Sequence, residues 1–130
     1  MSMFKAIGVA TTGVTVHRKW LDAVADNIAN VDNVSRTSEN AFQARYVIAQ
    51  AAQDGNGVQV GGIALGSAEG KLSYEPDNPL ADTEGYVRRA DIDLGSQMAQ
   101  MIMAQRSYQA NLSVVDRARD SYTAAINLGK

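Results

Sequence analysis

The sequence predicts an α+β protein in which long N- and C-terminal helices pack as a coiled coil, with a small β-rich segment between them. Apolar residues recur in alternate steps of four and three at both ends of the 130-residue chain, the spacing of helices that pack lengthwise on other helices. The middle instead combines β-branched and aromatic residues with turn formers. We therefore expect an N-terminal helix over 1–34, a loop and β-rich segment over 35–93, and a C-terminal helix over 94–130.

The N-terminal helix is expected to begin near Ser2 or Met3. Its apolar seam consists of Met3, Ile7, Ala10, Val14, His17, Leu21, Val24, Ile28 and Val31. The Asn- and Asp-rich run 30–35 should end it, because such side chains hydrogen-bond their own backbone. A loop is expected from there to about Asn40.

Three strands are expected in the middle segment. Residues 41–50 form the first, and the Asp-Gly and Asn-Gly pairs within 54–57 predict a hairpin turn after it. The second strand covers 58–65, where Gly61 and Gly62 indicate a bulge or a break. Residues 71–74 form a short third strand.

Asp91 or Asp93 is expected to cap the C-terminal helix, because a carboxylate there accepts hydrogen bonds from free amide groups. The seam of this helix continues almost to the end of the chain. It consists of Leu94, Met98, Met101, Gln105, Tyr108, Leu112, Val115, Arg119, Tyr122 and Ile126. Polar residues at seam positions, such as Gln105 and Arg119, more often set register or partner choice than catalyse a reaction.

The predicted helices are too long for a compact monomer. A compact 130-residue domain has a diameter of roughly 36 Å, whereas the two helices would measure roughly 42 and 50 Å. Exposed apolar stripes of that length favour association. We therefore expect self-association or a helical partner; the alternative is a single antiparallel helical hairpin that closes its own seam.

Composition excludes several classes of function. The net charge of -2, with scattered basic residues, does not predict nucleic-acid binding. The chain has no cysteine, so disulfides and thiolate chemistry are excluded. No apolar run is long enough to span a membrane, and no cleavable secretory signal is visible.

The sequence shows no catalytic constellation. His17 is the one histidine and lies on the seam, so a packed seam residue is a better interpretation than a catalyst, although its titration could tune association. The oxygen-rich run 75–84 lacks the ligand spacing of a calcium loop. We predict no enzyme activity and no catalytic, cofactor-binding or metal-binding residues.

Two motifs at opposite ends resemble one known family. Residues 26–31 read Asp-Asn-Ile-Ala-Asn-Val, and residues 106–111 read Arg-Ser-Tyr-Gln-Ala-Asn. They are similar to the N- and C-terminal signatures of the axial family of flagellar rod, hook and hook-associated proteins. The run 74–82, followed by Gly85-Tyr86-Val87, resembles the middle segment of a proximal-rod member of that family. The passage 34–42 departs from the family pattern, with Phe42 where a tyrosine is usual.

The resemblance implies a structural role. Members of this family build a helical tube with an inner layer of N- and C-terminal helices, and they are exported unfolded through the flagellar type III apparatus. The implied partners are further copies of the chain, other rod subunits and that export apparatus, in the rod where it crosses the periplasm. The expected assembly interface comprises Ile7, Val14, Leu21, Val24, Asn27, Ile28, Asn30, Met98, Met101, Tyr108, Asn111, Leu112, Val115, Tyr122 and Ile126.

Two other functions remain open at this point. The chain could be a secreted coiled-coil adaptor that binds a partner transiently. It could also be a small helical binding protein with a β insertion. Concentration-dependent filaments would favour the structural role, and a stable monomer with closed seams would favour the small binding protein.

Overall fold

The computed structural model describes residues 2–129. Met1 and Lys130, which our predicted terminal segments include, lie outside the described residues. The fold is α+β, as predicted. Its elements in chain order are α1 (Met3–Ala29), β1 (Val34–Ser35), β2 (Arg45–Ala51), β3 (Val58–Leu65), β4 (Lys71–Tyr74), β5 (Tyr86–Arg89) and α2 (Leu94–Leu128).

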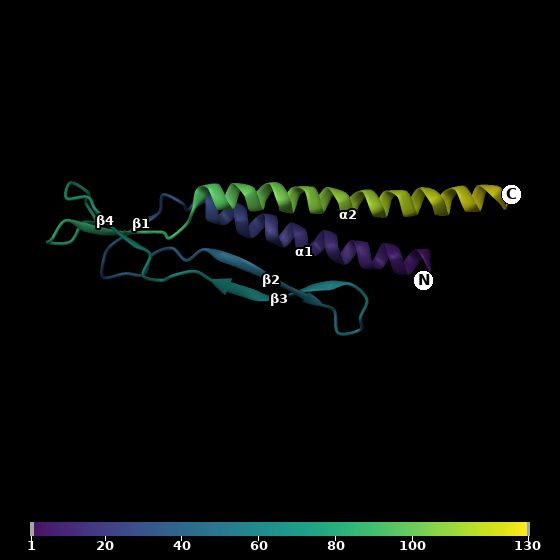
Figure 1. Cartoon of the computed structure of the whole chain (residues 1–130), viewed down its shortest axis with the longest axis horizontal. Helices are drawn as coiled ribbons and strands as arrows, with labels where there is room; N and C mark the ends of the chain where they lie inside the picture. The colour runs from purple at the N-terminus through teal and green to yellow at the C-terminus, as the bar shows by residue number, and fades with distance from the viewer. Residues whose placement is uncertain (1, 130) are drawn as a thin grey trace.

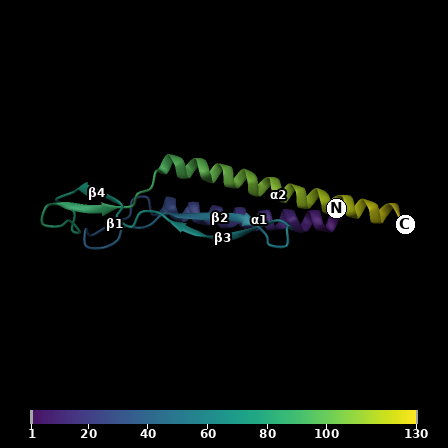
Figure 2. The same ribbon diagram turned by 60° about the horizontal axis from the view of Figure 1, so that its bottom comes forward.

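The molecule is elongated, and its two helices lie side by side in opposite directions (Figure 1). The β2–β3 hairpin lies along the other side of α1, so that α1 is covered by α2 and by the hairpin (Figures 1 and 2). A second small sheet forms the opposite end of the molecule from the two termini. Neither helix of the described chain has the length and apolarity needed to cross a bilayer.

Helix α2 continues past the beginning of α1. The ring of Tyr122 packs edge-on against Phe4, with ring centroids 5.2 Å apart, and Phe4 is the second residue of α1. Residues 123–128 therefore extend beyond the helix pair, and Figure 1 shows this end of α2 projecting past the N-terminus. We call residues 123–128 the α2 overhang.

Side chains cap both helices at their N-termini. The Ser2 hydroxyl accepts a hydrogen bond from the backbone N–H of Lys5 at 3.2 Å, which agrees with the predicted start. The Asp93 carboxylate accepts one from the N–H of Ser96 at 2.8 Å. Asp93 is thus the cap of α2, and the alternative, Asp91, instead pairs with Lys71 at 2.9 Å.

The β2–β3 hairpin confirms the predicted turn and bulge. Ile48 pairs with Gly62 and Ala49 pairs with Val60, so Gly61 is the extra residue of a bulge. The first strand was predicted over 41–50 but begins at Arg45 and ends at Ala51. Residues 41–44 continue beside 66–68 with fewer bonds, since the Gly66 N–H donates to the Ala44 carbonyl at 2.7 Å and the Ala41 N–H donates to the Ala68 carbonyl at 2.8 Å; the regular ladder begins only at Arg45.

The second sheet has the strand order β1-β5-β4, and both pairs are antiparallel. Its first strand is Val34–Ser35; the predicted bounds placed Val34 in the N-terminal helix segment, which ends earlier, at Ala29, and Ser35 in the loop that follows. Two residues carry too little local signal to predict a strand. Strand β1 exists because it pairs with β5, with Val34 opposite Arg89. Beside this sheet, Ala44, Ala90 and Ile92 form a small buried cluster.

Ionic and polar contacts hold this second sheet together. The Arg89 guanidinium donates to the Glu75 carboxylate at 2.6 Å, and the Asn78 amide donates to the same carboxylate at 2.9 Å. Hydrogen bonds from Arg89, Asn78 and Ser73 lower the pKa of the Glu75 carboxyl to about 2. The backbone N–H of Tyr86 likewise lowers the pKa of Asp82.

We predict that acid loosens this sheet through Glu75. The pKa of Glu75 in the folded chain lies below its usual value of 4.5. The ionised carboxylate therefore contributes its full stability at pH values above 4.5, and this contribution is lost as the pH falls toward about 2. An NMR titration of the carboxyl carbon should give a pKa near 2. In Arg89→Met the pKa should move back toward its usual value. An unchanged pKa in that variant would contradict the assignment.

Candidate assembly surface

A buried asparagine joins the three main elements at the base of the helix pair. The side-chain amide of Asn27 in α1 donates to the backbone carbonyl of Arg45 at 2.9 Å and to the side-chain oxygen of Gln97 at 3.0 Å. Its own oxygen accepts from the Arg45 N–H at 2.8 Å. Asn27 is fully buried and Gln97 nearly so. One amide group thus fixes α1, β2 and α2 relative to one another.

Neighbouring residues of the same sequence motif support this junction. Asp26 forms an ion pair with Arg45 at 3.0 Å, in an exposed position where such pairs contribute little. The Asn30 side chain donates to the Asp26 carbonyl at 2.8 Å and helps to end α1. The motif is therefore a structural corner in which α1 ends and β2 is anchored.

The residues of α2 that are covered within the chain, here called the covered stripe, have the predicted spacing. At every second position, however, the covered residue is the one just before the predicted residue. Its buried or half-buried residues in steps of four and three are Gln97, Met101, Ala104, Tyr108, Asn111, Val115 and Ala118. Met101, Tyr108 and Val115 were predicted seam residues. The predicted positions that alternate with these three, namely Met98, Gln105, Leu112 and Arg119, each lie one residue further along the helix than a covered residue and are exposed.

Small side chains bring α1 and α2 together midway along the pair. A Cβ atom placed on Gly13 would lie 2.8 Å from the side-chain oxygen of Asn111. The Asn111 amide is held by the Ser107 carbonyl at 2.9 Å. Nδ1 of His17 lies 2.7 Å from the Gly13 carbonyl, and because a carbonyl can only accept, the proton must be on Nδ1. Asn111 is thus a contact within the chain.

The tip of the β2–β3 hairpin is fastened to α1 by a threonine. The Thr12 hydroxyl accepts from the Val58 N–H at 3.1 Å and donates to the Val9 carbonyl at 2.6 Å. Gly57 touches the same side chain with φ of +114°, a conformation that favours glycine. The hairpin tip therefore stays close to the first half of α1.

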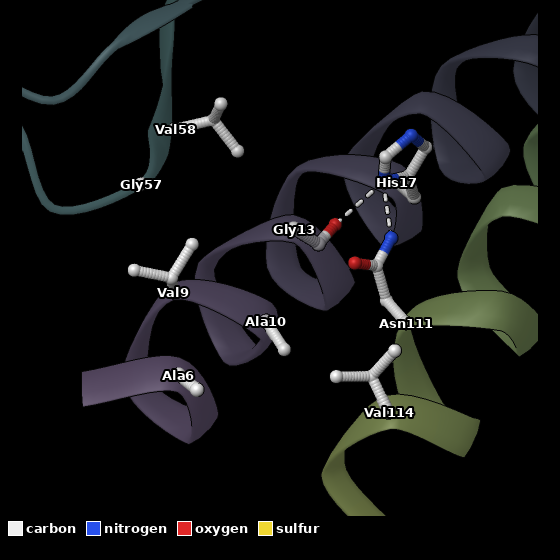
Figure 3. A pocket seen from close by; sticks show the side chains of 9 residues that line it. All are labelled: Ala6, Val9, Ala10, Gly13, His17, Gly57, Val58, Asn111 and Val114. Carbon is white, nitrogen blue, oxygen red and sulfur yellow. Dashed lines mark hydrogen bonds between the residues drawn. The ribbon is translucent and has the colours of Figure 1, made fainter. Parts of the chain in front are cut away.

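An apolar groove opens between the hairpin tip and α2, with α1 as its floor (Figure 3). Its volume is about 440 Å³. We call it the helix–hairpin groove; its lining residues are Ala6, Val9, Ala10, Gly13, His17, Gly57, Val58, Asn111 and Val114. Figure 3 shows Val58 on one side and Val114 on the other. Within residues 2–129, no carboxylate, lysine or arginine lines it.

The predicted interface residues divide into two groups. Those wholly or partly covered within the chain are Ile7, Val14, Leu21, Val24, Asn27, Ile28, Asn30, Met101, Tyr108, Asn111 and Val115. Those left exposed are Met98, Leu112, Tyr122 and Ile126. The exposed four lie on α2, together with other free apolar side chains such as Ile102 and Met103. This helix consequently presents apolar surface that its own chain does not cover.

The chain is similar to known proteins over its whole length. Residues 83–128, which include β5 and α2, match the family described as flagellar basal body rod FlgEFG protein, C-terminal. The chain is 32% identical over 134 residues to the flagellar basal-body rod protein FlgC of Salmonella typhimurium, with all of both chains covered. The chain belongs to the FlgC family of flagellar basal-body rod proteins.

Other FlgC proteins support the same assignment. The relative from Yersinia enterocolitica is 33% identical, and that from Bacillus subtilis is 26% identical, each with both chains fully covered. The FlgC family is structural, and its members are components of the basal-body rod and so of the motility apparatus. The resemblance seen in residues 26–31 and 106–111 is thereby confirmed at the level of the family.

Sequence reasoning missed three residues that fix this FlgC-family fold. These residues are Gln97, Gly13 and Thr12. Because they are polar or small, a search for regularly spaced apolar residues does not include them. A partial signal existed for Gly13, because glycine in a helix interior costs up to about 1 kcal/mol and calls for a packing reason. Gln97 and Thr12 gave no signal, since their partners lie far away in sequence.

We predict that Asn27→Ala destabilises the chain strongly. It leaves the backbone groups of Arg45 and the Gln97 side chain without their partner, and each buried unpaired group costs about 1–3 kcal/mol. The loss in free energy of unfolding should be about 3–5 kcal/mol by urea denaturation. The exposed Asn33→Ala is the control and should change it by less than about 0.5 kcal/mol. Equal effects of the two substitutions would refute the junction.

We predict opposite effects of valine at the two glycines of α1. Among the described residues, no atom outside its own helix turn lies within 4 Å of the position that a Cβ would take on Gly8. Gly8→Val should therefore leave stability unchanged or raise it by a few tenths of a kcal/mol, about the propensity difference. Gly13→Val should lower it by about 1–3 kcal/mol, because it displaces Asn111. Urea denaturation provides the measurement.

A double variant tests whether the Gly13 effect runs through the Asn111 side chain. Adding Asn111→Ala to Gly13→Val should restore part of the lost stability, because the smaller side chain makes room for the valine. Additive effects of the two substitutions would show that the contact is absent.

Proposed function

We propose that this chain is a structural subunit of the proximal rod, which assembles helically through its terminal helices with further copies and with other rod subunits. The assembled tube would transmit torque across the periplasm and enclose the export channel. The subunit would reach its place unfolded, through the flagellar type III apparatus. Family membership and the sequence motifs at both ends support this proposal.

The observation that carries the proposal is the large exposed surface of the isolated chain. It amounts to 8475 Å², whereas a compact monomer of 13.9 kDa exposes about 6,700 Å². The excess is about 1,800 Å², and a standard interface buries about 800 Å² on each partner. The excess thus corresponds to about two interfaces per subunit, as expected of a subunit with neighbours on more than one side.

The transient-adaptor function is the second candidate, because free apolar surface also suits a transient partner. The two functions differ in how the surface is used. A rod subunit needs permanent contacts on opposite sides, whereas an adaptor needs one contact that dissociates. The free apolar side chains occur both on α2 and on the hairpin, for example Ile102 at 50% exposure and Ile63 at 49%. This distribution over two elements favours the rod subunit.

We predict that Leu112→Asp abolishes rod assembly while leaving the isolated fold intact. Leu112 is 37% exposed in the chain, so losing its partial contacts should cost the isolated fold only about 1–2 kcal/mol. In a dry interface between subunits, however, an unpaired carboxylate costs several kcal/mol, in the range of about 3–5. The variant should be made and exported, but the cells should build no complete rod and should not swim.

Ser113→Asp is the matched control, since it places the same charge on the next residue, which is also exposed. It should affect swimming much less. Motility assays and electron microscopy of basal bodies provide the measurement, and circular dichroism checks the fold of the purified variant. Normal swimming with intact basal bodies in Leu112→Asp cells would refute the structural role of this face.

A further inference from the structure

We propose that the α2 overhang of one copy docks in the helix–hairpin groove of a second copy of this chain. The inference rests on the proposed function, because it names a surface through which rod subunits would join. Groove and overhang are different surfaces of the same molecule. Such heterologous contacts generate open helical assemblies unless the rotation between copies happens to close a ring.

The groove suits an uncharged helical segment. Its floor on α1 runs from Ala6 to His17, about 17 Å at the rise of an α-helix. Small residues such as Ala10 and Gly13 keep this floor low, and the valines of the hairpin and of α2 form apolar walls. Because none of the lining residues in the described part of the chain is a carboxylate, lysine or arginine, a charged segment would lose its hydration there without gaining a partner.

The end of α2 has the matching chemistry and length. From Ser121 to Gly129 the chain carries no charged residue, and this stretch measures roughly 13 Å as a helix. Ile126 is 45% exposed and Leu128 is 89% exposed. Moreover, the overhang continues the α1-facing side of α2: Tyr122 packs on Phe4, and Ile126 lies one turn further on, where α1 has ended.

The overhang cannot fill the groove of its own chain. Val58 in the groove wall is bonded to Thr12, whereas Ile126 lies beyond Phe4 in the opposite direction. Counted along the helix axes, these two positions are separated by roughly 18 Å. An intrachain disulfide requires Cα atoms less than about 7 Å apart. A bridge between these positions therefore reports contact between two copies.

The absence of cysteine from the chain makes this contact testable by disulfide trapping. Val58→Cys and Ile126→Cys are combined in one chain, which is co-expressed with the wild-type chain so that rod formation does not depend on the variant. After mild oxidation, basal bodies are purified and analysed by non-reducing gel electrophoresis and immunoblotting. The expected result is a ladder of dimers and higher multimers that collapses to monomer on reduction.

A second pair, Ala6→Cys with Leu128→Cys, tests the same contact should the first pair perturb packing, and it should also give a ladder. The control pair combines Ile126→Cys with Leu72→Cys, a position 65% exposed on the second sheet; it should give no ladder. If the chain is present in basal bodies but both test pairs give monomers or dimers only, the docking proposal is overturned and the proposed function stands. If basal bodies lack the chain, both are overturned.

Discussion

The arrangement of the whole molecule depends on one buried amide, that of Asn27. It is completely removed from solvent and satisfies backbone and side-chain groups from two other elements. An apolar residue of similar size could fill the space, but it would leave the Arg45 backbone unpaired at a cost of about 1–3 kcal/mol for each group. The amide therefore acts as a specificity element. It sets the angle and register at which α2 and the hairpin meet α1.

The second determinant is the close approach of the helices where side chains are small. Gly13 faces Asn111, while the covered stripe of α2 includes Ala104 and Ala118. This explains why the pattern of apolar residues predicted the correct spacing of the covered stripe of α2 but, at every second position, the residue next to the covered one. The pattern included Leu112 because it is apolar, whereas the residue that contacts α1 is Asn111, which is smaller and more polar. The larger residue remains available for surfaces outside the chain.

Local signals predicted much of the fold. A cap at Asp91 or Asp93, the turn at 54–57 and a bulge or break at Gly61 and Gly62 were expected from residues adjacent in sequence, and the structure selects Asp93 and a bulge at Gly61. The two-residue strand β1 and the packing of the hairpin on α1 depend on pairings between distant segments, which a single sequence does not reveal. Likewise, the motif residues of the candidate interface were recognisable, but the role of Asn27 within the chain required the positions of β2 and α2.

The placement of both termini at one end has a consequence for how the chain folds. Phe4 meets Tyr122, so the contact at this end of the helix pair closes a loop of more than a hundred residues. At a synthesis rate of about 5–20 residues per second, α1 waits roughly 5–20 s for its partner helix. Formation of so non-local a contact is slow as well, because loop closure must come first. The nascent chain thus has a built-in delay before it can become a rigid body.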